Sequence, residues 1–242
     1  MRPAGQAILS RRRADGWKAP RRSAAPFRWR LVIMAKAPVA GHAKMRLAGA
    51  AGVGAALRFA RHSLASLVQR IAMDGRWVTT LAVTPDMAAT SRLWPRGVRL
   101  LPQGGGDLGA RMQRLFDRAP PGPVVIVGTD IPRLSRAHIH AAFRLLGRHD
   151  AVLGPAEDGG YWLVGLRRRP RTLQPFHGVR WSTGHALADT LRNLRGRSVA
   201  HLPTLFDVDT AADLARCAGS VGRRFQSHTA DNSPSVNILD AG

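Results

Sequence analysis

An acidic residue follows the most apolar short run of the chain at the point where that run must leave a folded core. Val124–Val127 is a β-branched stretch, and Asp130 comes after it, separated by Gly128 and Thr129. Such a run is typical of a strand buried on both faces. Ligands of open parallel sheets bind beyond the carboxyl ends of the strands, where Mg²⁺ prefers one or two carboxylates plus substrate phosphates. Asp130 is therefore a candidate metal ligand, with a helix N-cap as the alternative.

Basic residues surround a glycine after the first apolar run. Lys36, Gly41, Lys44 and Arg46 lie between that run and the next helical pattern, and the chain has only three lysines. Glycine lets backbone N–H groups approach an anion, and a lysine meets a phosphate as a compact charge. The spacing is not that of a Walker A loop. These four residues are candidates for binding phosphate, and a solvated turn is the alternative.

A second glycine-rich segment, residues 103–112, contains three successive glycines, which are very unlikely inside a helix. Asp107 is placed to cap the helix that follows. Gln103 and the glycine backbone are candidates for contacting a base or a ribose. Glycine-rich turns are common, so the segment has little value as a motif on its own.

Two adjacent acids precede two glycines and an aromatic residue late in the chain. Glu157, Asp158, Gly159, Gly160 and Tyr161 form this group. Acids beside flexible glycines and a stacking aromatic ring suit a sugar or another polyol. The structural alternative is a hairpin turn with the ring packed over it.

The elements that must position these residues alternate between strand and helix patterns. Strands are expected over residues 31–34, 77–83, 98–101, 124–127, 151–153 and 198–202, with a further strand through Val164. Helices are expected over residues 55–71, 137–146 and 185–194, with two more starting near Leu108 and Thr210. Ser182 or Thr183 suits the N-cap of the helix over 185–194, and residues 167–171 suit a basic loop. This alternation predicts an α/β fold, a three-layer sandwich around a mostly parallel central sheet.

Length and composition indicate the number of domains, the class of partner and the cellular location. The 242 residues are enough for one large domain, expected over 30–221, between a disordered basic arm at 1–29 and a disordered tail at 222–242. The formal charge is +22, but arginine dominates the bases and Glu157 is the only glutamate, which looks like codon bias. We therefore expect no specific nucleic-acid partner. The single cysteine, Cys217, and the lack of a long apolar run favour a cytoplasmic protein without a membrane span.

Taken together, six ordered blocks resemble a known family over about Leu31 to Leu214. The blocks are residues 36–47, 106–112, 128–132, 154–166, 181–183 and 207–214. They resemble the GT-A-like glycosyltransferase family formerly filed as a domain of unknown function, one branch of which is named for arsenosugar biosynthesis. The wider superfamily of nucleotide-diphospho-sugar transferases includes nucleotidyltransferases such as 2-phospholactate guanylyltransferase.

This resemblance implies a GT-A-like nucleotide-diphospho-sugar transferase that uses Mg²⁺ or Mn²⁺, a nucleotide sugar and a small-molecule acceptor. Asp130 matches the metal-binding aspartate of the superfamily, and Asp209 takes the place of its second metal ligand. Gln103 and Asp107 would lie by the nucleoside. The basic loop with Lys36 and Lys44 would meet the phosphates.

The same resemblance places Glu157, Asp158 and Tyr161 at the acceptor or sugar. Asp158 or Glu157 would accept the proton of the acceptor hydroxyl. Together with Asp130, these two acids are the candidate catalytic residues. Two alternatives stay open on the sequence: nucleotidyl transfer with release of pyrophosphate, and a non-catalytic nucleotide-binding module on the same fold.

Overall fold

The computed structural model describes residues 28–39, 49, 52–91, 93–168 and 171–206. Its centre is a sheet of seven described strands in the order β3-β2-β1-β4-β6-β5-β7. The strands are β1 (Trp29–Lys36), β2 (Trp77–Thr84), β3 (Arg99–Pro102), β4 (Gly122–Val127), β5 (Ala151–Pro155), β6 (Tyr161–Arg168) and β7 (Val199–His201). The described α-helices are α2 (Val53–Leu67), α3 (Leu108–Arg118), α4 (Arg136–Leu146) and α5 (Ala186–Asn193). The α/β class expected from the sequence is confirmed.

The sheet is mostly parallel, with one strand reversed. β1 pairs in parallel with β2 and β4, β2 pairs in parallel with β3, and β5 pairs in parallel with β7. Only β6, among the described strands, runs antiparallel to its neighbours, β4 and β5. The chain builds outward from β1 to β3 and then returns to place β4 on the other side of β1. The carboxyl ends of β1 and β4 therefore form the switch point where open α/β sheets bind ligands.

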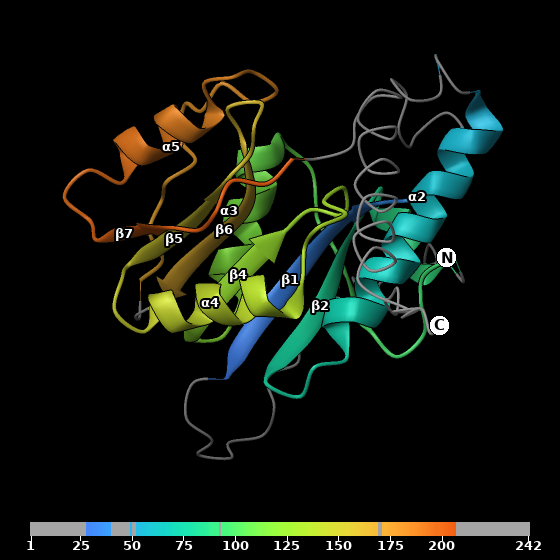
Figure 1. Cartoon of the computed structure of the whole chain (residues 1–242), viewed down its shortest axis with the longest axis horizontal. Coiled ribbons are helices and arrows are strands. Elements are labelled where there is room, and N and C mark those ends of the chain that lie inside the picture. Colours follow the sequence, from blue (N-terminus) through green and yellow to red (C-terminus); the bar gives the residue numbers. More distant parts are fainter. Residues whose placement is uncertain (1–27, 40–48, 50–51, 92, 169–170, 207–242) are drawn as a thin grey trace, which may run out of the picture.

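Helices cover both faces of the sheet, as Figure 1 shows with α4 and α2 in front and α3 behind. Alternation along β4 explains this arrangement, because Val125 and Val127 pack with the α4 residue Phe143 on one face. Val124 and Ile126 pack on the opposite face with Phe116 of α3 and its neighbours. All four valine and isoleucine side chains of this run are buried, which confirms a strand enclosed on both sides.

Three differences from the sequence-based expectation change the interpretation of a segment. The helix that begins at Val53 is α-helical only to Leu67 and continues as a π-helical turn to Ala72. Strand β6 extends to Arg168, into the segment expected to be a basic loop. Helix α5 starts at Ala186 with His185 at the N-cap, so the expected cap at Ser182 or Thr183 is wrong. The Thr183 hydroxyl instead closes a turn before the helix, where it accepts from His185 N and donates to the Arg180 carbonyl.

Several expectations lie outside the described residues. These are the basic arm, the tail, the helix after Thr210, and the site candidates Gly41, Lys44, Arg46 and Asp209. Within the ranges that the structure describes, no helix combines the length and the apolar character needed to cross a membrane.

Candidate functional site

A cavity of about 940 Å³ lies at the switch point. The register explains which residues meet there, because Ile33 of β1 pairs with Val127 of β4. Lys36 and Asp130 each lie three residues beyond that pair (36 − 33 and 130 − 127), and both line the cavity. Its volume is near the upper end of the roughly 300–1,000 Å³ that ligand pockets span. A lysine and an aspartate thus flank one large opening at the edge of the sheet.

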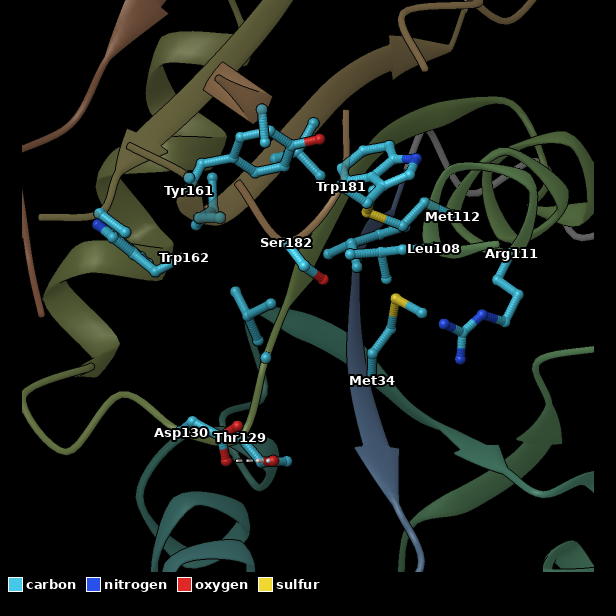
Figure 2. A pocket seen from close by; sticks show the side chains of 18 of the residues that line it. Met34, Leu108, Arg111, Met112, Thr129, Asp130, Tyr161, Trp162, Trp181 and Ser182 are labelled. Carbon is cyan, nitrogen blue, oxygen red and sulfur yellow. Dashed lines mark hydrogen bonds between the residues drawn. The ribbon is translucent and has the colours of Figure 1, made fainter. Parts of the chain in front are cut away.

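Asp130 leaves β4 through a short polar segment. Gly128 ends the strand, and the Thr129 hydroxyl donates to Asp130 Oδ1 at 3.1 Å, the contact drawn dashed in Figure 2. Asp130 is partly exposed, and Ile131 behind it is buried. The carboxylate is therefore fixed at the rim by a buried neighbour and a hydroxyl, and it remains accessible to a ligand in the cavity.

A buried glutamine holds an arginine on the β1–β3 side of the cavity. Gln103 is 2% exposed, and its amide nitrogen donates to the carbonyls of Ala35 and Ala82. Its Oε1 accepts from Arg111 Nη1 at 3.1 Å, and Arg111 Nε donates to the Asp107 carbonyl. Gln103 thus ties β1 to β2 and holds the Arg111 guanidinium at the cavity. The sequence alone predicts the ligand contact at Gln103 itself.

The turn between β5 and β6 forms part of the opposite wall. Asp158 Oδ1 accepts from Gly160 N at 2.8 Å, and Ala156 N donates to the Gly160 carbonyl, so the segment is a hydrogen-bonded hairpin turn. Gly159 has φ +82°, and its carbonyl accepts from Leu187 N at the start of α5. The turn that carries Asp158 is therefore held against helix α5.

Two aromatic rings complete that wall. Tyr161 and Trp181 meet edge to face with their centroids 6.3 Å apart. The Tyr161 hydroxyl accepts from Thr190 Oγ1, and burial raises the pKa of Tyr161 above its ordinary value. Tyr161 therefore stays protonated near neutral pH and serves as a packing and hydrogen-bonding group.

A buried carboxylate fixes the loop that carries Trp181 and Ser182. Asp189 of α5 is 3% exposed and accepts from the backbone N–H and both guanidinium arms of Arg180, and also from Arg192. The hydrogen bonds from Arg180 hold the pKa of the Asp189 carboxyl well below its usual range. Arg180 is thereby turned to Asp189, and the residues after it face the cavity.

Asp189→Asn should lower the thermal midpoint of unfolding at neutral pH by several degrees, and the loss should shrink in acid. A carboxyl whose folded pKa is depressed stabilises the fold above its unfolded pKa of about 3.9. That contribution disappears as the pH falls through the folded value. Melting curves of both proteins from about pH 7 to below about pH 3 test this prediction. A difference that stays constant over this range would contradict it. The exposed Asp117→Asn is the matched control.

The structure brings together six of the predicted site residues as lining of one cavity: Lys36, Gln103, Asp130, Asp158, Gly160 and Tyr161. Glu157, Gly159 and Asp107 lie beside the cavity without lining it. Asp107 caps α3 by accepting from Ala110 N, which confirms the predicted cap. The lining also includes polar and aromatic residues that the sequence did not indicate, among them Thr129, Arg111, Trp181 and Ser182. All four lie inside the sequence blocks already singled out, so only their roles were missed.

No group of three or more His, Cys, Asp or Glu side chains that could hold a metal occurs among the described residues. A metal site formed by Asp130 and substrate phosphates does not require such a group of side chains, because Mg²⁺ commonly binds through one or two carboxylates and phosphate oxygens. The accessible Asp130 carboxylate at the cavity rim, with Lys36 lining the same cavity, fits such a site.

Comparison with known proteins agrees with this geometry. Residues 67–183 match the family described as "Uncharacterized protein conserved in bacteria (DUF2064)". A solved structure from Desulfovibrio desulfuricans G20, described as a candidate nucleotide-diphospho-sugar transferase, is 30% identical with a TM-score of 0.68. That match covers 76% of this chain and 83% of the other. The chain belongs to the nucleotide-diphospho-sugar transferase superfamily.

Two solved structures of lower sequence identity show a likeness of fold alone. CMP:2-keto-3-deoxy-manno-octonic acid synthetase, solved with CTP, is 12% identical with a TM-score of 0.51, over 81% of this chain and 99% of the other. The 4-diphosphocytidyl-2C-methyl-D-erythritol synthase of Anaerococcus prevotii DSM 20548 is 10% identical with a TM-score of 0.50, over the same shares. No curated protein is significantly similar to the sequence.

Proposed function

We propose that the protein is a glycosyltransferase-like enzyme that moves a sugar from a nucleotide-diphosphate donor to a small-molecule acceptor with a divalent metal. One observation carries the proposal: Lys36 and Asp130 flank a single large cavity at the switch point of the sheet, and Asp158 lines the same cavity. A cation beside a metal-binding carboxylate suits a diphosphate, and a second carboxylate suits the hydroxyl that attacks. Membership of the superfamily supports the same class of reaction.

The residues have distinct roles in this proposal. Lys36 offsets negative charge that develops on the departing diphosphate. Lys44 and Arg46, which lie outside the described residues, are proposed to do the same. Asp158 accepts the proton of the acceptor hydroxyl, and its orientation is fixed by the N–H of Gly160. Glu157 is the alternative base in the same turn.

A divalent cation held by Asp130, with Asp209 as the proposed second ligand, would act as a Lewis acid on the diphosphate. Arg111 and the α3 residues near it would contact the nucleoside, with Gln103 holding the Arg111 guanidinium in place. The hydrogen bonds from the Gln103 amide to the Ala35 and Ala82 carbonyls keep that side of the cavity in one shape.

A thermal-shift screen of nucleotides and nucleotide sugars, with and without Mn²⁺, tests the proposal on the full chain. We expect Mn²⁺-dependent stabilisation by at least one nucleoside diphosphate or nucleotide sugar, since a ligand that binds only the folded protein raises its melting temperature. Failure of every nucleotide to stabilise the protein would contradict the proposal.

Product analysis then separates the two chemistries. Release of a nucleoside diphosphate indicates glycosyl transfer, and release of pyrophosphate from a nucleoside triphosphate indicates nucleotidyl transfer. Binding without either product would identify a nucleotide-binding module. A product that contains an arsenosugar would place the protein in the branch named for that pathway.

A further inference from the structure

The loop between β6 and α5 puts a non-glycine residue in a costly backbone conformation at the cavity. Ser182 has φ +59°, and it is the only described non-glycine residue with positive φ. Such a conformation is strained in a residue with a side chain, and residues that adopt it cluster at ligand clamps and active sites. Because Ser182 lines the cavity and is exposed, the strain places a hydroxyl at the site.

The neighbouring contacts explain why this conformation persists. Arg180 is anchored to Asp189 by its backbone and its guanidinium, and the Thr183 hydroxyl donates to the Arg180 carbonyl at 2.8 Å. Behind the loop, the Trp181 ring packs against Gly109, where an added Cβ would come within 2.8 Å of the ring. The contacts of the residues before and after Ser182 therefore hold its backbone in this conformation.

Two adjacent hydroxyls in this loop differ in what they contact. The Thr183 hydroxyl is used within the loop, by Arg180 and His185. The Ser182 hydroxyl has no hydrogen-bond partner among the described residues, and Figure 2 shows it pointing to the middle of the cavity, between the aromatic pair and Asp130. A hydroxyl that is held in place and unused by the loop can bind a ligand.

The charges of this wall restrict what that ligand is. The wall comprises Asp158, Tyr161, Trp181, Ser182 and Thr183, and no lysine or arginine belongs to it among the described lining residues. The two described cations that line the cavity, Lys36 and Arg111, come from the β1–β3 side. Asp158 would repel a phosphate or carboxylate on the acceptor, whereas hydroxyls and aromatic rings suit an uncharged polyol.

We propose that Trp181 and Ser182 form the acceptor subsite, and that the acceptor is an uncharged hydroxyl-bearing molecule with an apolar face, such as a glycoside. This inference rests on the proposed function and names its second substrate. The acceptor oxygen, oriented by Ser182, forms a bond to the anomeric carbon of the donor sugar. The bond from that carbon to the diphosphate breaks, its electron pair leaves with the diphosphate, and the hydroxyl proton passes to Asp158.

The proposal is tested with a panel of methyl hexopyranosides and the matching hexose 6-phosphates as acceptor probes. The full chain is incubated with the nucleotide sugar that stabilises it most, and release of nucleoside diphosphate above donor hydrolysis is measured. We expect stimulation by at least one neutral glycoside and at least about tenfold less by its phosphorylated counterpart. Stimulation mainly by the phosphates, or by no member of the panel, would overturn the proposal.

Ser182→Ala and Ser182→Gly assign the effect to the hydroxyl. Both variants remove it, but glycine tolerates positive φ, so Ser182→Gly keeps the loop conformation if alanine disturbs it. We expect both to raise the acceptor KM about fivefold to tenfold, the size of one neutral hydrogen bond, with the nucleotide affinity unchanged. An unchanged acceptor KM in both would overturn the role of Ser182. If the unmodified protein shows no Mn²⁺-dependent nucleotide binding, the proposed function itself is refuted.

Discussion

Asp130→Asn should abolish the enhancement of nucleotide binding by Mn²⁺ and leave the fold intact. The amide keeps the size of the side chain and loses the charge that holds the cation. Metal stabilisation of phosphate oxygens is worth several kcal/mol, and about 1.4 kcal/mol corresponds to a tenfold change in affinity. We therefore expect the Mn²⁺-dependent affinity for the stabilising nucleotide to fall by about 100-fold or more. Isothermal titration with and without a chelator measures both states.

The metal-free titration makes this prediction specific. Without metal, the substitution removes a negative charge next to the phosphates, so the affinity should stay equal or increase. Asp117→Asn, an exposed residue near the end of α3 that does not line the cavity, changes the net charge equally and should retain the response to Mn²⁺. A variant at Asp130 that keeps the full response to Mn²⁺ would reject the metal role of this residue.

Gly159→Ala should cost more stability than an alanine substitution at a positive-φ glycine that has no close neighbour. The turn between β5 and β6 rests directly on the loop before α5, and an added Cβ at Gly159 would overlap the backbone of Gly184. Backbone cannot move aside as a flexible side chain can, so overpacking of about 1–3 kcal/mol adds to the strain of a positive φ, which is about 1 kcal/mol. Urea unfolding at neutral pH measures the total.

Gly178→Ala separates the two contributions. Gly178 also has positive φ, at +63°, but an added Cβ there meets nothing within 4 Å. It should therefore cost only the conformational strain, about 1 kcal/mol. Equal losses for the two variants would mean that the turn is not packed on the α5 loop. Asp158 would then be less firmly placed than the structure indicates.

The alternation of apolar runs was enough to predict the sheet and the edge of the sheet at which the cavity lies. The run Val124–Val127 identified a strand buried on both faces, and the residue three positions beyond it lies at the cavity. Local patterns sufficed here because a parallel strand between two helical layers must be apolar throughout. The antiparallel direction of β6 was indicated only by the short connection from β5, which allows a hairpin and no crossover.

The roles of individual polar residues depended on contacts between distant segments, which spacing does not reveal. The residue type of Ser182 predicts a helix N-cap, but the hydrogen bond from Thr183 to Arg180 closes a turn before the helix starts. The sequence predicts that Gln103 contacts a ligand, but its amide donates hydrogen bonds to the carbonyls of Ala35 and Ala82. Only the pairing of β1 and β2 brings these two carbonyls close together. Arg111 acquires its place at the cavity from that glutamine.

A crystal structure of the full chain with Mn²⁺ and the nucleoside diphosphate that stabilises it most would test the central claim directly. We predict anomalous density for manganese bonded to a carboxylate oxygen of Asp130 and to the diphosphate, with Lys36 at the phosphates and Asp209 close enough to be the second ligand. A diphosphate bound elsewhere, or a metal that does not contact Asp130, would contradict the account.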